Sequence, residues 1–224
     1  MREPAPPLPA PARAGRRLRT ALLVLLVADA GAAWVVLIGV FTLLQRVWLS
    51  LGGVVVSASI ETHVAQLQAA RRIQGLLDLA TVAVFLGWIW RAHRNVRMLG
   101  VARLGFSPRA AVAAFLIPMV NLVAPVRVVR ELWHASRIED TERPWWEAGV
   151  PGVVTAWWAC VLVTAVADPV WRRLAADVDS LAIGGPTVLF MVAQLTNLAA
   201  AVLGIAIVWT IDARQAEHFQ ALER

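Results

Sequence analysis

The sequence predicts an all-α, polytopic membrane helical bundle of four transmembrane helices plus a proline-broken re-entrant hairpin, with five transmembrane helices as the alternative. Three observations predict it: 59% of the 224 residues are hydrophobic, only 16% are charged, and the apolar residues gather in long runs. Soluble domains are nearer half apolar and a quarter charged, so the excess indicates a membrane protein. The pattern shows neither strand alternation nor an internal repeat.

Four apolar runs are long enough to cross about 30 Å of hydrocarbon at about 1.5 Å per residue. They cover residues 20–44, 73–90, 148–167 and 187–211, and together define a single membrane helical domain over residues 20–211. Before the second run, residues 60–67 are predicted to form a short amphipathic turn of helix on the membrane surface. Asp168 and Pro169 are expected to close the third run.

The two ends of the chain are predicted to lie outside the helical domain. Residues 1–19 are rich in proline, alanine and arginine, which favours a disordered cytoplasmic tail, and residues 212–224 form a short cytoplasmic tail. Ala28, Asp29 and Ala30 fit a small-x-small cleavage site, so a cleaved signal peptide is the alternative for the first run. The apolar stretch continues well past Ala30, which favours an uncleaved helix.

The segment at about residues 108–137 begins like a membrane helix and is then broken by proline. Ser107 and Pro108 predict an N-cap followed by a first-turn proline. The helix should end at Ile117, because Pro118 disfavours the α conformation at the residue before it. Ten residues cover only about 15 Å, or half of the hydrocarbon thickness.

A second helix is predicted to begin near Pro125, after an irregular turn that contains Asn121. The Asn121 side chain carries hydrogen-bonding groups that fit a turn at membrane depth. The second helix is expected to be amphipathic, with Val126, Val129 and Trp133 on one side and Arg127, Arg130 and Glu131 on the other. These features predict a re-entrant hairpin, and a proline-kinked fifth span is the alternative.

Arginine counts favour the hairpin. If the segment turns back, both termini face the cytoplasm, and 16 arginines lie inside against 5 outside. If it crosses, the counts are 12 and 9, a weaker positive-inside bias. We expect the basic loop between the second run and the hairpin to meet anionic lipid headgroups through Arg91, Arg94, Arg97, Arg103 and Arg109.

A pattern of aromatic, proline and polar residues runs from Phe85 to Ser136. Its members are Trp88, Arg91, Asn95, Ser107, Pro108, Pro118, Asn121, Pro125, Glu131 and Trp133. This pattern resembles a family of bacterial integral membrane proteins described as domain of unknown function 4328. The resemblance implies a multi-pass protein of the bacterial cell (inner) membrane without an assigned activity, and makes these ten residues the candidate functional residues.

Polar side chains inside the apolar runs form a second set of candidates. Their depths predict two levels, Asp29 with Asn197 and Asp78 with Gln194. Ionisable groups within a span indicate function by default, here a proton- or cation-responsive path. The alternative, which we favour, is interhelical hydrogen bonding worth about 0.6 kcal/mol per contact.

The sequence shows no catalytic, cofactor-binding or metal-binding pattern. The four histidines have no metal-ligand spacing, Cys160 is the single cysteine, and nucleophile elbows and phosphate-binding glycine loops are absent. We therefore predict a non-enzymatic binding or scaffolding membrane protein without a cofactor. The alternative is a transporter or channel component with an ion or solute site at the broken helices. Candidate partners are anionic lipids, a second copy of the chain or another membrane protein, but not nucleic acid.

Overall fold

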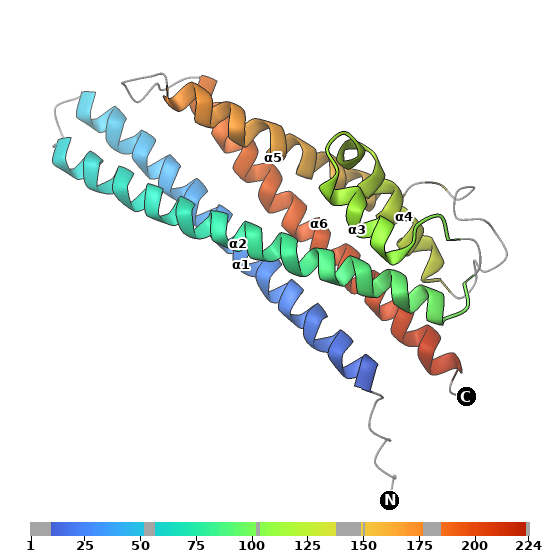
Figure 1. The fold of residues 1–224 in the computed structure, drawn as a ribbon. Helices are drawn as coiled ribbons and strands as arrows, with labels where there is room; N and C mark the ends of the chain where they lie inside the picture. The colour runs from blue at the N-terminus through green and yellow to red at the C-terminus, as the bar shows by residue number, and fades with distance from the viewer. Residues whose placement is uncertain are drawn as a thin grey trace, which may run out of the picture. The chain divides into compact units, whose positions relative to one another are not determined.

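The computed structural model describes residues 10–51, 57–101, 104–137, 149, 151–176 and 185–222, and their regular structure is helical throughout. The all-α prediction is confirmed. In chain order the elements are α1 (Ala10–Leu51), α2 (Ser57–Met98), α3 (Pro108–Leu116), the short 3₁₀ helix η1 (Val120–Leu122), α4 (Ala124–Ala135), α5 (Gly152–Ala176) and α6 (Gly185–Leu222) (Figure 1).

Four of these helices are long and apolar enough to cross a membrane. The candidate spans are Gly15–Ser50, Ile60–Met98, Gly152–Leu174 and Pro186–Ala221. They fall on the four predicted runs, and α3 and α4 are not among them. The prediction of four spans with a separate broken segment is therefore confirmed for the described part of the chain.

Helices α1, α2 and α6 begin earlier and end later than hydropathy predicted. Helix α1 starts at Ala10, so residues 10–19 differ from the predicted disordered tail, and residues 1–9 lie outside the described part. Helix α6 continues to Leu222, so residues 212–222 are helical. Hydropathy marks where a helix leaves the apolar layer, whereas the helical hydrogen-bond pattern can continue through polar residues beyond that point.

Two further predictions about helix boundaries are wrong. Helix α2 is continuous, so residues 60–67 are part of the long helix and not a separate turn on the surface. Helix α5 continues through Pro169 to Ala176. Proline in a helix interior removes one hydrogen bond, and here Asp168 and Arg172 form an ion pair one turn apart across this position.

Tertiary contacts divide the chain into two compact units, which are described separately. Unit 1 comprises Met1–Val24, Val82–Gly149 and Val208–Arg224, and unit 2 comprises Leu25–Thr81 and Val150–Ile207. The buried side chains of unit 1 include Trp88, Ile89, Val128, Leu132 and Ile211. In unit 2 a core of Val36, Val40 and Phe190 packs against Leu67 and Trp171.

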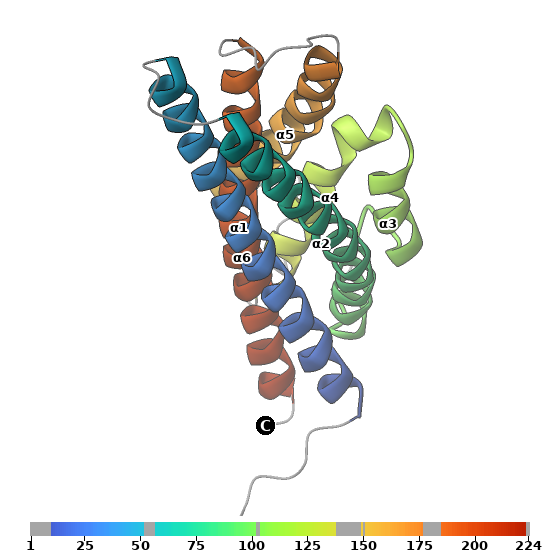
Figure 2. The same ribbon diagram turned by 90° about the vertical axis from the view of Figure 1, so that its left-hand side faces the viewer.

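The proline-broken segment in unit 1 folds back on itself, and α3 and α4 pack against each other (Figure 2). Ser107 caps α3 as predicted, because its side chain accepts a hydrogen bond from the Ala110 backbone N–H at 3.1 Å. Helix α3 ends where Ile117 becomes extended, with φ −83° and ψ 118°. Pro118 follows at once and explains this stop.

The turn between α3 and α4 is tight and strained. Met119 has φ 67° and ψ −44°, and the Val120 N–H donates to the Pro118 carbonyl at 2.8 Å, which together make a γ-turn of the rare, strained type. The Asn121 N–H donates to the Ile117 carbonyl at 2.9 Å. Helix α4 then begins at Ala124 with Pro125 in its first turn, as predicted.

Candidate functional site

Several of the candidate residues converge in unit 1, where α2, α4 and the last turns of α6 meet. Trp88 Nε1 donates to Asp212 Oδ1 at 3.0 Å. Arg91 Nη2 lies 2.8 Å from both carboxylate oxygens of Asp212. Because Asp212 is only 8% exposed, this is a buried charge pair with a third, neutral donor on the same carboxylate. Arg91 is thus engaged within the protein, which corrects the expectation that it meets a lipid headgroup.

Helix α1 approaches the same pair through Gly15. A Cβ added at Gly15 would collide with the Arg91 guanidinium group. Arg91 therefore lies between the backbone of α1 and the Asp212 carboxylate. One turn along α1, the Arg19 guanidinium carbon lies 5.4 Å from the Trp209 ring centroid, which is a cation–π distance.

A chain of neutral hydrogen bonds continues from Asn95. Its Nδ2 donates to Gln215 Oε1 at 3.0 Å. Gln215 Nε2 in turn lies 3.3 Å from the Ala92 carbonyl and 3.2 Å from Ser136 Oγ. The Gln215 amide therefore connects α2 and α6 to the end of α4, with both of its polar atoms satisfied.

Glu131 of α4 binds the backbone of the loop that leads into α3. Its carboxylate accepts hydrogen bonds from the backbone N–H groups of Gly105 at 2.8 Å and Phe106 at 3.2 Å. Its Oε1 lies 3.5 Å from His93 Nε2, and both side chains are fully buried. The prediction that Glu131 lies on the exposed polar side of the second helix is wrong, because these three partners compensate its burial.

His93 lies between α2 and α4. Its Nδ1 lies 3.2 Å from the Ile89 carbonyl oxygen. The other ring nitrogen, Nε2, faces Glu131. His93 therefore contacts the backbone of α2 through one ring nitrogen and Glu131 of α4 through the other.

Trp133 completes the set. Its ring centroid lies 4.6 Å from the guanidinium carbon of Arg214, and Arg214 Nη1 donates to the Trp133 carbonyl at 3.1 Å. Arg214 therefore binds both the ring and the backbone of one residue. This contact ties α6 to α4 a second time.

The remaining candidates lie along the hairpin and away from this network. Ser107 and Pro108 begin α3, Pro118 ends it, and Pro125 is buried at the start of α4. Asn121 is exposed, and among the described residues its side chain has no hydrogen-bond partner. Its side chain therefore does not satisfy backbone groups of the turn. The prolines shape the hairpin, whereas the polar candidates of α2 and α4 hold it in place.

Unit 2 contains the four polar residues predicted within the spans, and one of the two predicted pairs is found. Asn197 Nδ2 lies 3.5 Å from Asp29 Oδ2, so these two side chains do lie at one level. The Asp78 carboxyl group lies next to the Asp29 carboxyl group. Gln194 instead accepts a hydrogen bond from Gln74 Nε2 at 2.9 Å. The predicted level of Asp78 with Gln194 is therefore wrong.

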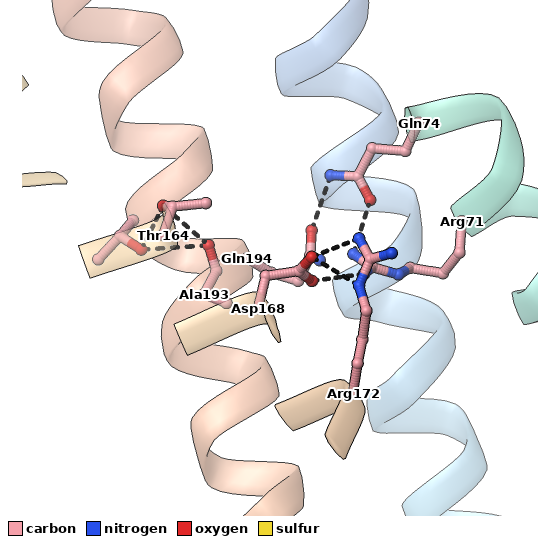
Figure 3. Close-up of polar contacts among 8 residues, drawn as sticks. Arg71, Gln74, Thr164, Asp168, Arg172, Ala193 and Gln194 are labelled. Carbon is pink, nitrogen blue, oxygen red and sulfur yellow. Dashed lines mark hydrogen bonds and ion pairs between the residues drawn. The ribbon is translucent and has the colours of Figure 1, made fainter. Parts of the chain in front are cut away.

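Figure 3 shows the network that surrounds the Gln74–Gln194 pair. Arg71 Nη2 binds Asp168 Oδ1 at 2.5 Å, and Arg71 Nη1 donates to Gln74 Oε1 at 3.3 Å. Arg172 also pairs with Asp168. The Arg71 guanidinium carbon lies 4.9 Å from the Phe190 ring centroid and 5.5 Å from that of Trp171. The network joins α2, α5 and α6, and satisfies the charge of Arg71 from two directions.

Sequence reasoning missed four residues of the unit 1 network. Asp212, Arg214 and Gln215 fell in the predicted C-terminal tail, and His93 was treated as a scattered histidine. One signal was available: α6 contains no proline or glycine from Ile205 to Leu222, so the helix had no reason to end at Ile211. The partners of Asp212 and Gln215 on α2 were not visible, because they lie more than 100 positions away in sequence.

The charged side chains of this network bind one another and backbone groups. In the described ranges, no group of three or more His, Cys, Asp or Glu residues could hold a metal ion. The charges of Asp212, Glu131 and Arg91 are used by partners within unit 1. These contacts hold the hairpin against α2 and α6.

A family model described as "Domain of unknown function (DUF4328)" matches residues 53–213, which is most of the chain. The match includes all ten residues of the aromatic, proline and polar pattern. No curated protein and no solved structure matches the chain.

Proposed function

Because the chain belongs to the DUF4328 family, whose description assigns no activity, we propose a function from the surface of unit 1. The protein is a non-enzymatic integral membrane protein that binds anionic lipid headgroups and presents its hairpin at the bilayer interface. A hairpin held rigidly in this way is also a scaffold for a second copy or for another membrane protein. The observation that carries the proposal is the arginine distribution between the two units.

Sixteen of the 21 arginines belong to the sequence ranges of unit 1, and five belong to unit 2. The five in unit 2 are Arg46, Arg71, Arg72, Arg172 and Arg173. Around the hairpin and the end of α2, the exposed arginines are Arg94, Arg97, Arg109, Arg127 and Arg137. Juxtamembrane clusters of this kind attract anionic headgroups, with about 1 kcal/mol for each basic residue near the surface.

The tip of the hairpin supports contact with the membrane. Met119 is 81% exposed, Leu116 62% and Leu122 54%, so the turn presents apolar side chains outward. Arg127 lies one turn into α4 and is exposed. An apolar tip with arginines beside it suits the boundary between headgroups and acyl chains, where arginine extends its charge back toward water.

The same distribution supports an orientation. Unit 1 contains both chain termini and both sequences that flank the hairpin. Under the positive-inside rule, an arginine-rich set of short segments faces the cytoplasm. We therefore propose that both termini are cytoplasmic and that the protein resides in the bacterial inner membrane.

Lipid binding is tested on the full chain in nanodiscs of phosphatidylcholine with and without phosphatidylglycerol. The variant Arg94→Gln/Arg97→Gln/Arg109→Gln/Arg127→Gln/Arg137→Gln should lose most of the rise in melting temperature that phosphatidylglycerol causes in the wild type. A matched control, Arg46→Gln/Arg173→Gln, removes two exposed arginines of unit 2 and should keep that rise. An equal response of both variants contradicts the proposal.

The orientation is tested by cysteine labelling in a Cys160→Ala background. Arg97→Cys, Arg137→Cys and Gln220→Cys are exposed positions in unit 1, and Gln45→Cys is exposed in unit 2. On intact spheroplasts, a membrane-impermeant maleimide should label only Gln45→Cys. The other three positions should be labelled only after the membrane is permeabilised. Labelling of Arg137→Cys from outside would instead identify a fifth span.

The second candidate function is a transporter or channel component with an ion or solute site at the broken helices. The strained turn at Met119 and the exposed Asn121 amide favour it, since interrupted helices form such sites in transporters. It predicts that Asn121→Ala lowers ion or solute flux into protein-containing vesicles without loss of melting temperature. Unchanged flux relative to empty vesicles removes this candidate.

A further inference from the structure

Three helices of unit 2 each direct one polar side chain to a common point. Asp29 lies near the middle of the candidate span in α1, and Asp78 lies near the middle of the span in α2. The Asp78 carboxyl group lies next to that of Asp29, and Asn197 of α6 lies 3.5 Å from Asp29 Oδ2. Asp29 is only 5% exposed. The point is therefore inside the protein and within the apolar part of the helices.

The pair lacks a basic partner within the described residues. The side chains that meet at this point are Asp29 from α1, Asp78 from α2 and Asn197 from α6. On α5, Asp168 pairs with Arg172 and with Arg71 of α2, and Arg173 is exposed. Two ionised carboxylates in contact repel each other, so one of them must be neutralised.

One oxygen of the pair also lacks a donor. Asp29 Oδ1 is buried and has no hydrogen-bond partner among the described residues, whereas Oδ2 faces the Asn197 amide. A buried acceptor without a donor costs about 1–3 kcal/mol. Two adjacent carboxyl groups can form a hydrogen bond to each other only if a proton lies between them.

We propose that Asp29 and Asp78 form a proton-binding site that holds one proton between their carboxyl groups. Binding converts one carboxylate to a carboxylic acid, which donates to the other, and the pair keeps a single negative charge that the Asn197 N–H stabilises. A hard metal cation would instead need about six to eight oxygen ligands. Here the Asn197 N–H group, which cannot bind a metal ion, occupies a position where an oxygen ligand would be needed. The site is independent of lipid binding by unit 1.

The test is infrared spectroscopy of the full-length protein in nanodiscs at neutral pH. A protonated carboxyl group has a C=O stretching band that carboxylates lack. The wild type should show this band, and the band should shift when only the aspartate carboxyl carbons carry ¹³C. Both Asp29→Asn and Asp78→Asn should lose the band, because the new amide donates an N–H to the remaining carboxylate.

The controls remove other carboxyl groups. Glu131→Gln removes the buried carboxyl group beside His93, and Glu61→Gln removes an exposed one of α2, and both should keep the band. A wild-type spectrum without an aspartic acid band at neutral pH overturns the proposal, whether or not the variants fold. A band that persists in both Asn variants also overturns it. If the band is absent and the melting temperature rises with sodium chloride but not with choline chloride, the site holds a metal cation instead.

Discussion

Trp88 Nε1 donates a hydrogen bond to Asp212 Oδ1 at 3.0 Å, although 124 positions separate the two residues in sequence. Arg91, one turn along α2, binds the same carboxylate. This contact joins the end of one candidate span to the end of another. It also gives two residues of the family pattern a structural role, which is to hold α6 beside α2.

Asp212→Ala should destabilise the protein by about 3–5 kcal/mol, because it leaves the Arg91 charge without its partner in a buried position. The measurement is thermal unfolding in nanodiscs, in which the melting temperature should fall. Glu217→Gln, an exposed change five residues further along α6, should alter stability by no more than about 0.5 kcal/mol. Equal melting temperatures for the two variants contradict the role assigned to Asp212.

Glu131→Ala should release the loop that leads into α3. The Gly105 and Phe106 N–H groups lose their shared acceptor, at about 1–3 kcal/mol for each group left unsatisfied. Hydrogen–deuterium exchange of the peptides that cover residues 104–116 should become faster. Arg127→Gln, an exposed change on the same helix, is the control and should leave the exchange rates unchanged. Slow exchange in Glu131→Ala argues against this contact.

Gly15→Ala and Gly31→Ala should have opposite effects. The new methyl group at residue 15 meets the Arg91 guanidinium, which Asp212 holds in place, so the variant is destabilised by about 1–3 kcal/mol. A methyl group added at Gly31 would meet only open space, so alanine there should stabilise the helix by about 0.5–1 kcal/mol. The melting temperature should fall for Gly15→Ala and rise for Gly31→Ala. A shift of the same sign in both variants would contradict the prediction.

Met119→Gly should stabilise the hairpin turn. The positive φ of Met119 strains a residue with a side chain, at about 1–3 kcal/mol, and glycine adopts this conformation without that strain. The gain should appear as a higher melting temperature. Val120→Gly, at the next position with ordinary backbone angles, is expected to have no such gain. A lower melting temperature for Met119→Gly would show that its side chain matters more than its backbone.

The Gln74–Gln194 pair should behave as a coupled unit. Each single change to leucine leaves a buried amide without its partner, which costs about 1–3 kcal/mol. The double variant Gln74→Leu/Gln194→Leu removes both amides, so it should be more stable than either single variant. A double-mutant cycle of melting temperatures measures the coupling, and additive effects would mean that the two side chains do not interact.

The features that depend on neighbouring residues could be predicted from the sequence. Four apolar runs were long enough to span a bilayer, and a candidate span lies on each of them. The break between α3 and α4 followed from Pro118, because a proline restricts the residue directly before it. Helix ends were predicted less well, since polar residues such as those of α6 after Ile211 leave the apolar layer without leaving the helix.

The partners of the candidate residues could not be predicted in the same way. Residue depth along the helices correctly paired Asp29 with Asn197, but it failed for Asp78 and Gln194, because depth fixes a level and not the direction in which a side chain points. For Glu131, helical periodicity predicted an exposed polar face, and burial was decided by two backbone N–H groups and His93.

By itself, the sequence determined the helical class, the number of candidate spans and the place where the fifth apolar segment breaks. Those properties arise from hydrophobicity and backbone sterics, which act over a few residues. Only the tertiary structure decided that Asp212 binds Trp88 and Arg91, and that Asp29 lies against Asp78. Such pairings depend on how whole helices rotate and pack, and that is settled by contacts between residues far apart in the chain.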